Sequence, residues 1–501
     1  MAHTAHTTHT ARTVHTFSGL GLHVALDVES GAVHLLDEIG LAVLRRMAPP
    51  IGDSCPPDLV AALSPDFAPE DVEEAWGELH ALVREGQLFS PKTVYPAPGE
   101  MGEEVRKALC LHVAHDCDLR CGYCFAQSGH YGGKRGIMPF EIAKAAIDRL
   151  VGQSGPRRNL EIDFFGGEPL LAWDTVTRAV GYVRAHEGVW GKRFRFTLTT
   201  NGLALADDRI DFLNREMDNL VLSLDGRRDT HDALRRTPAG EGSYDAVLNN
   251  LRRVLATRRR SYYLRGTFTA RNPDFVDDLL HMADLGFQNL SMEPVVLPAA
   301  HPLALREEHM DTVCRAYDRL LEIMSRRDDF SFFHFTVDLA QGPCVYKRLR
   351  GCGAGFAYAA VSPSGDLYPC HQFVGQPAYK MGNVRGGGGD GGYDGDGDGD
   401  GDVDGDVGVN AATAHEIAKR LSRLTVDAKP ACAACWARFY CGGGCAAAGV
   451  LLGGQPDSVY ELGCRMQKKR LECAILLRVG RMISEDEKPA ISKGVQLTEK
   501  L

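Results

Sequence analysis

The sequence predicts an α/β fold in which a parallel sheet curls into an incomplete, TIM-like (β/α)6 barrel. Strand patterns and amphipathic helix patterns alternate through residues 107–300, as they do in parallel sheets. Polar motifs follow several of these strands, at the end where such barrels build active sites. A small separate unit lies before the barrel. Of the 15 cysteines, 11 fall into spaced sets, one in the first loop of the barrel and the others after the barrel.

Composition narrows the class of protein. The chain has 501 residues, 44% hydrophobic and 24% charged, which is typical of a globular protein with about three domains. We find no signal-peptide core, bilayer-length apolar run or basic patch, and therefore expect a cytoplasmic protein that binds neither membrane nor nucleic acid. In a reducing compartment, cysteines are metal ligands or catalytic thiols more often than disulfides.

The N-terminal part is expected to hold a tail and a small domain. Residues 1–16 repeat His, Thr and Ala and predict a disordered tail, although a His-rich tract can also bind metal. Residues 17–95 show a β-hairpin pattern, two helical patterns and a short apolar pair, Leu88-Phe89, that is a candidate third strand. This order is similar to a winged-helix unit. Because no basic residues line its second helix, we do not expect this unit to bind DNA. We expect it to bind an extended peptide by strand addition. Residues 96–106 are a linker.

Six strands are expected in the barrel: 109–114, 161–165, 194–200, 220–224, 262–269 and 289–295. The first leads into Cys117-Asp-Leu-Arg-Cys121-Gly-Tyr-Cys124. The second ends in Gly166-Gly167-Glu168-Pro169, the third in Asn201, and the fourth contains Ser223 and is followed by Asp225. The carboxyl ends of parallel strands meet at one edge, so these motifs are expected to form one site.

The remainder divides into a bridge (301–343), a cysteine-rich domain (344–478) and a polar tail (479–501). Within the cysteine-rich domain, residues 385–410 are a Gly/Asp insertion that we expect to be flexible, since it would bury almost nothing. Its aspartates resemble the start of a calcium-binding loop. Val407, however, stands where the bidentate glutamate of such a loop belongs.

The cysteine loop carries the first chemical prediction. Three cysteines can ligate three irons of a 4Fe–4S cluster and leave the fourth iron open, whereas a structural cluster usually takes four. A zinc site is the alternative, but zinc prefers four ligands, commonly in two pairs.

The pattern CxxxCxYC after a first strand resembles the radical S-adenosylmethionine (SAM) superfamily. The resemblance implies that SAM binds to the open iron of the Cys117, Cys121 and Cys124 cluster and is split to a 5′-deoxyadenosyl radical. It also implies that Gly166-Gly167-Glu168-Pro169 contacts the SAM amino group. It further implies that Ser223 and Asp225 hydrogen-bond the SAM ribose, with Asn201 beside them. Arg265 would pair with the SAM carboxylate, and the backbone of Met292-Glu293 would contact the adenine. A structural ion pair is the alternative for Arg265.

The downstream cysteines are similar to the SPASM extension of radical SAM peptide-modifying enzymes, which implies two auxiliary 4Fe–4S clusters. The outer cluster would take Cys432, Cys435, Cys441 and Cys464. The inner cluster would take Cys352, Cys370 and Cys445, with Cys344 as the candidate fourth ligand. Two zinc sites are the alternative.

The resemblance extends further, to the thioether-forming maturases of "six cysteines in forty-five residues" peptides, also called SCIFF or ranthipeptide maturases. It rests on His115–Phe125, Asp163–Pro169, Met217–Gly226, Arg265–Thr269 and Tyr368–Phe373, among other stretches, and it runs from about residue 17 to residue 478. It implies a Cys-rich precursor peptide that binds through its leader to residues 17–95, and a flavodoxin- or ferredoxin-type reductant. A peptide cysteine on an open iron of the inner cluster would then bond to a carbon radical of the same peptide.

Two points remain open at this stage. His371 stands where related alcohol- or thiol-oxidising enzymes have an Asp; it is either a base or proton relay, or a hydrogen-bonding neighbour of the cluster. The alternatives to thioether formation are another radical modification, such as a carbon–carbon crosslink or a dehydrogenation, and a non-catalytic iron–sulfur electron carrier that binds a leader. The SAM motifs disfavour the carrier.

Overall fold

The structure is a computed structural model that describes residues 13–96, 105–339, 345–386 and 411–483. The expectations for residues 1–12, for most of the linker, for Cys344, for residues 387–410 and for the tail from residue 484 lie outside this part.

The N-terminal unit is a three-stranded antiparallel sheet with three helices. Its elements are β1 (Val14–Gly19), β2 (Leu22–Asp27), β3 (Val33–Leu36), α1 (Glu38–Leu44), α2 (Pro57–Leu63) and α3 (Pro69–Arg84). The Asp37 carboxylate caps α1 by accepting from the amide of Gly40 at 2.7 Å. Proline opens both α2 and α3, where its missing N–H costs no hydrogen bond.

Two details differ from the sequence expectations. Strand β1 begins at Val14, inside the segment expected to be a tail, because Val14 and Phe17 are buried. Leu88-Phe89 is a bend and not a strand, and Phe89 has a positive φ of 51°. A short apolar pair without an alternating neighbour does not specify a strand.

The main sheet has nine strands in the order β12-β11-β10-β8-β7-β6-β4-β13-β14, all parallel except the β13–β14 pair. The strands are β4 (Ala108–Ala114), β6 (Asn159–Gly166), β7 (Arg193–Thr200), β8 (Asn219–Ser223), β10 (Ser261–Phe268), β11 (Asn289–Pro294), β12 (Ser331–Phe332), β13 (Tyr358–Val361) and β14 (Leu367–Tyr368). The predicted α/β fold with a parallel sheet is confirmed, and the six expected strands are neighbours. The structure adds β12 at one edge and β13–β14 at the other.

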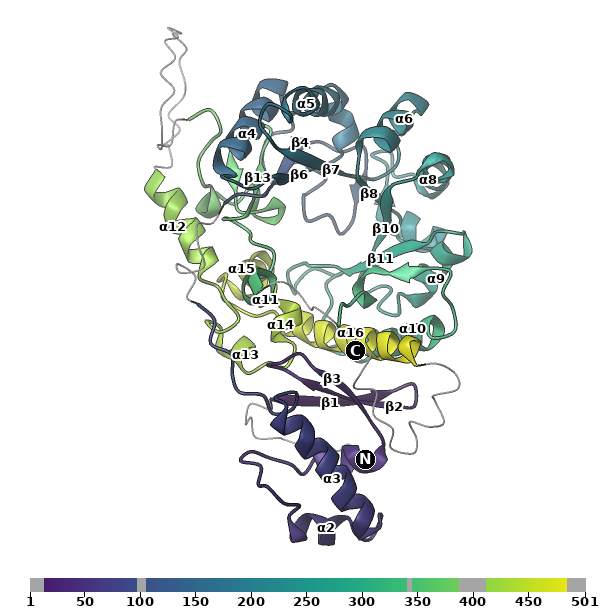
Figure 1. Cartoon of the computed structure of the whole chain (residues 1–501). Coiled ribbons are helices and arrows are strands. Elements are labelled where there is room, and N and C mark those ends of the chain that lie inside the picture. The colour runs from purple at the N-terminus through teal and green to yellow at the C-terminus, as the bar shows by residue number, and fades with distance from the viewer. Residues whose placement is uncertain (1–12, 97–104, 340–344, 387–410, 484–501) are drawn as a thin grey trace.

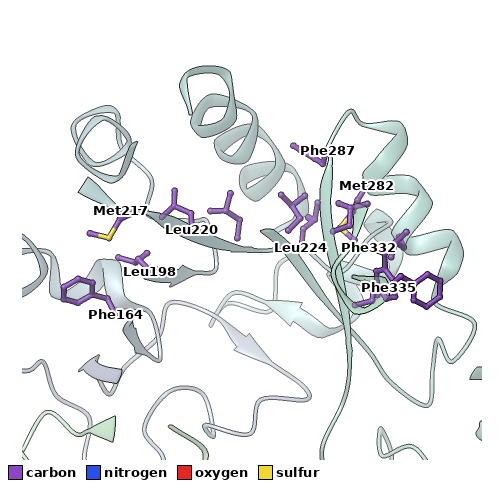
Figure 2. Packing of buried hydrophobic residues seen from close by; sticks show 14 of the residues in the cluster. Phe164, Leu198, Met217, Leu220, Leu224, Met282, Phe287, Phe332 and Phe335 are labelled. Atoms are coloured by element: carbon purple, nitrogen blue, oxygen red, sulfur yellow. The ribbon is translucent and has the colours of Figure 1, made fainter. Parts of the chain in front are cut away.

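Helices cover the outer face of this sheet (Figure 1). They are α4 (Phe140–Gln153), α5 (Trp173–His186), α6 (Asp207–Glu216), α7 (Arg228–Leu234), α8 (Tyr244–Thr257) and α9 (Val276–Asp284). Strand residues alternate between this covered face and the opposite, concave face. On β10, for example, Leu264, Gly266 and Phe268 are buried while Arg265 is exposed. Figure 2 shows Phe164, Leu198 and Leu220 from three adjacent strands packed in this core.

The C-terminal part wraps back onto both other units. Its elements are α10 (Glu307–Met324), α11 (Val345–Arg350), α12 (Ala411–Ser422), α13 (Pro430–Ala433), α14 (Arg438–Cys441), α15 (Ala446–Gly453) and α16 (Glu461–Met482), with short 3-10 turns at Phe333–Phe335, His371–Phe373 and Pro377–Tyr379. Helix α16 runs between the barrel and the N-terminal sheet (Figure 1). Its Glu472 pairs with His15 of β1 at 2.9 Å. In the described ranges, no helix combines the length and apolarity needed to cross a bilayer.

Candidate active site

The cysteine loop is fixed to the end of β6 by its backbone. The amide of Gly167 donates to the carbonyl of Ala114 at 2.8 Å, and the amide of Glu168 donates to Asp116 at 2.9 Å. A Cβ atom on Gly166 or Gly167 would overlap with these same two carbonyl oxygens. The paired glycines are therefore required for the close contact between the two loops, and not only for the approach of a ligand.

Glu168 joins two strand ends. Its fully buried carboxylate accepts hydrogen bonds from the amide of Leu170 at 3.0 Å, the Thr200 hydroxyl at 2.8 Å and the amide of Asn201 at 2.8 Å. Burial, followed by the nearby charge of Asp118, raises the pKa of Glu168 to about 7. In this structure neutral donors hold the carboxylate, and its position fixes the end of β7 against the end of β6.

Asn201 reaches from β7 to the cysteine loop. Its side-chain amide donates to the Asp118 carboxylate at 2.6 Å and lies 3.7 Å from the sulfur of Cys117. The predicted neighbour of the SAM site is thus in direct contact with the first cysteine.

Tyr123, the tyrosine of CxxxCxYC, connects the cysteine loop to β8. Its hydroxyl donates to the Asp225 carboxylate at 2.6 Å and accepts from the Arg235 guanidinium at 2.7 Å. The other Asp225 oxygen accepts from the amide of Thr267 at 3.1 Å. Asp225 was expected at the SAM ribose; here its buried carboxylate orients Tyr123.

Arg235 was missed by the sequence analysis. It lies on β9 (Arg235–Arg236), which pairs with β5 (Arg120–Cys121) so that Arg235 is opposite Cys121. Its buried guanidinium lies 3.8 Å from the Asp225 carboxylate. Its partners on the cysteine loop, Tyr123 and Cys121, are over 100 residues away in sequence, so no local pattern singles it out.

The three thiols of this loop lie within electrostatic range of one another. Burial, and then the charges of Glu168 and other groups including Cys121, raise the pKa of Cys117 to about 12. Burial also raises the pKa of Cys121, to about 11, and Cys124 contributes to this shift. All three are only partly buried, so a ligand can reach them.

The downstream cysteines fall into two groups. Burial raises the pKa of Cys370 to about 12, and Cys445 and Cys352 add to the shift, so these three are neighbours. Likewise, after burial, the pKa of Cys464 is raised to about 11 by three thiols, those of Cys441, Cys432 and Cys435. The SPASM resemblance named the same two sets, with Cys344 in addition; that they are the ligands of two auxiliary clusters stays a prediction.

The donor set suits iron–sulfur clusters. Each group contains only thiols, the usual protein ligands of 4Fe–4S clusters. Within the described ranges, no three His, Cys, Asp or Glu side chains are close enough to share one metal ion. Thiols that hold a four-iron cluster bind different irons and need not be as close together as the ligands of one ion.

His371 and Arg265 face the concave side of the sheet. The His371 ring packs on Phe165 of β6 at 5.1 Å between ring centroids, and its pKa is lowered to about 4 by burial and then by the charge of Arg265. Arg265 on β10 is paired in register with Ser223 of β8. Its guanidinium lies 3.9 Å from Glu293 of β11.

Residues 111–282 match the Radical SAM superfamily model, so this segment, with the cysteine loop and the strand ends described above, is a radical SAM domain. Its family implies SAM and a 4Fe–4S cluster as cofactors.

Known relatives cover more of the chain. It is 22% identical over 293 residues to the radical SAM cyclopropyl synthase TigE of Paramaledivibacter caminithermalis, spanning 54% of this chain and 58% of TigE. It is 26% identical over 301 residues to the mycofactocin maturase MftC of Mycobacterium tuberculosis, spanning 58% of this chain and 70% of MftC. The chain thus spans less than two thirds of TigE.

Among solved structures, native anSMEcpe with bound AdoMet and the Kp18Cys peptide aligns with a TM-score of 0.59 and 19% identity. The alignment covers 75% of this chain and 100% of that one. The likeness supports the α/β radical SAM fold.

Proposed function

We propose that this protein is a radical SAM peptide maturase that installs Cys-to-carbon thioether crosslinks in a ribosomally made, Cys-rich precursor. One observation carries the proposal furthest. Cys124 of the first group and Cys370 of the inner group pack on the same apolar cluster, together with Tyr131 and Phe165. The proposed radical source and a second thiol-rich group therefore lie close together, on either side of one apolar cluster, so a peptide that reaches one is near the other.

The cysteine groups are the cofactor ligands in this proposal. Cys117, Cys121 and Cys124 hold the SAM-binding cluster, and the inner and outer groups hold two auxiliary clusters, with Cys344 the candidate fourth inner ligand. When bound, the first cluster supplies the electron that cleaves SAM to a 5′-deoxyadenosyl radical.

The surrounding residues position the loop and the substrate. Glu168 and Asn201 hold the cysteine loop against β6 and β7, and Tyr123 holds it against β8 through Asp225. Ser223 is half-buried at the end of β8, where it remains a candidate SAM contact. His371 lies beside Cys370 and packs between Phe125 and Phe165, which favours it as a neighbour of the inner site that helps to exclude water.

The N-terminal unit is the proposed receptor for the precursor. Its sheet ends at β1 and β3, and among the described residues neither edge pairs with a further strand. An extended leader peptide can add to such an edge through main-chain hydrogen bonds. The maturase name of the relative MftC supports a substrate that is matured by the enzyme, which we take to be a peptide.

The test is anaerobic reaction of the reconstituted protein with SAM, a reductant and the short Cys-rich peptide encoded next to it. We expect a loss of two hydrogens per crosslink and one cysteine per crosslink that no longer reacts with an alkylating reagent. A mass change with all thiols still alkylatable contradicts thioether formation and favours a carbon–carbon crosslink or a dehydrogenation. Absence of SAM cleavage in the reduced protein contradicts an enzyme and favours an electron carrier.

A further inference from the structure

The concave face of the sheet carries an incompletely neutralised cation. Arg265 points to this face with 49% of its side chain exposed, and within the described ranges its guanidinium donates no hydrogen bond. Its nearest acidic partner there is Glu293, at 3.9 Å, the outer limit of an ion pair.

Glu293 is engaged mainly by other groups. Its carboxylate accepts from the Ser291 hydroxyl at 3.1 Å and lies 3.1 Å from the His334 ring. Arg470 of α16 approaches the other ring nitrogen of His334 at 3.0 Å. Glu293 is therefore held by closer partners than Arg265, and the Arg265 guanidinium is only weakly paired within the described part of the structure.

Arg265 also lies beside a residue of the expected SAM site, because it is the register partner of Ser223 on the neighbouring strand. Two aromatic rings lie nearby: Tyr263, two residues earlier on the same face, packs edge-on against Phe333 at 5.2 Å, and Phe333 is 48% exposed.

We propose that Arg265 is the anchor for an acidic side chain, Asp or Glu, of the substrate peptide. A guanidinium presents paired N–H donors that match a carboxylate, and it binds one strongly where water is partly excluded. The exposed Phe333 ring offers apolar contact for the neighbouring peptide backbone. The inference rests on the proposed function, because it takes the barrel interior to be the place where the peptide is held.

The experiment measures binding, not turnover. Two capped tetrapeptides, acetyl-Cys-Gly-Asp-Gly-amide and its Asn counterpart, are titrated anaerobically into the reconstituted, SAM-loaded enzyme. The wild-type enzyme is expected to bind the Asp peptide about tenfold more tightly, the usual order for a charge-assisted contact. Arg265→Gln should abolish this preference, and Arg265→Lys should retain part of it.

Two further variants sharpen the test. Glu293→Gln removes the competing carboxylate and should increase the preference for the Asp peptide. Arg260→Gln makes the same change to an exposed arginine that pairs with Asp218 before β10, and should leave the preference unchanged. Iron content and the visible spectrum of each variant report whether its fold is intact.

Specific outcomes overturn the inference. If the wild-type enzyme has no preference between the peptides, Arg265 is not a carboxylate anchor for the substrate. If Arg265→Gln weakens SAM binding and leaves the peptide preference intact, Arg265 binds the SAM carboxylate instead. Failure of the proposed function would appear separately, as absence of crosslinks in the full-length precursor.

Discussion

At the scale of single residues, the first cysteine group depends on a backbone contact that only glycine permits. Gly167→Ala would place a methyl group on the carbonyl oxygen of Asp116 and push the cysteine loop away from β6. We expect a loss of about 1–3 kcal/mol in stability, with weaker SAM binding and loss of the iron bound by this loop. The measurements are iron content, SAM affinity and denaturant unfolding.

Gly181→Ala is the matched control. Gly181 lies within α5, and a Cβ atom there would meet nothing within 4 Å. Alanine should stabilise that helix by about 0.5–1 kcal/mol and leave iron content unchanged. Equal iron content in the two variants would show that the glycine contact does not position the loop.

The Tyr123 hydroxyl provides a second test at this scale. Tyr123→Phe leaves the buried Asp225 and Arg235 without their shared partner, at a cost of about 1–3 kcal/mol. We expect iron to be lost faster to a chelator, because the cysteine loop is less firmly tied to β8. Tyr182→Phe removes an equally short 2.6 Å bond, to Asp148 on the helical face, and should not change the rate. Equal rates in the two variants would contradict this role.

The sequence predicts which residues carry chemistry better than it predicts their contacts. The first cysteine group was expected from its local spacing, whereas the two downstream groups, which join cysteines far apart in sequence, were expected only from the resemblance. Glu168 and Asp225 were expected at SAM, which stays a prediction, whereas their hydrogen bonds from Thr200 and Thr267 had no signal in the sequence. Arg235 had no sequence signal, because its role comes from a β5–β9 pairing of distant segments.

At the scale of elements, the N-terminal unit packs against the segment between two cysteines of the outer group. Between Cys435 and Cys441, Trp436 stacks on His15 of β1 at 3.9 Å, and Phe439 packs edge-on against Tyr95 at 5.8 Å. Arg438 forms a buried ion pair with Glu29, in the turn after β2. The outer cysteine group and the proposed leader receptor therefore share one interface.

Breaking this buried pair should destabilise the interface. Glu29→Gln leaves the Arg438 guanidinium buried without its counter-charge, a change that costs about 3–5 kcal/mol. We expect a lower unfolding temperature and loss of outer-group iron before inner-group iron. Mössbauer or EPR spectroscopy during treatment with a chelator measures the order in which iron is lost.

An exposed pair in the same interface is the control. Lys92 and Asp427 are 3.5 Å apart with 64% and 36% of their side chains exposed. Lys92→Met should cost less than about 1 kcal/mol. If Glu29→Gln and Lys92→Met behave alike, the N-terminal unit does not support the outer group.

Helices and strands could be predicted from the sequence where their apolar pattern extends over many residues. The six expected strands agree with the structure because apolar periodicity is a local property. The position of β13 beside β4 was not predictable, since strand order is set by contacts between segments 250 residues apart. Strand β1 escaped notice for a related reason: its His15 contacts Trp436 and Glu472 of α16, which are distant in sequence.

At the scale of the whole molecule, the apolar cores are unequal. The main sheet with its helices, α10, α16 and one face of the N-terminal sheet share one large core. The core beside the outer group is small: Val28, Leu349, Val426, Cys432 and Phe439 are its buried members. A small core supplies little stabilisation of its own, so the cysteine-rich segment should depend on its clusters to remain folded.

Hydrogen exchange of the cluster-free and reconstituted proteins tests this dependence. On removal of iron, amides in α11, α13 and α14 should lose protection, while those in α4 and α5 should keep it, because the latter helices pack on the large core. Helix α16 should divide at its middle: its start near Cys464 should become exposed, and its second half, which packs on β1 through Leu476, should remain protected. Uniform loss of protection along α16 would mean that the clusters support the N-terminal unit as well, and unchanged protection throughout would mean that they are not needed for folding.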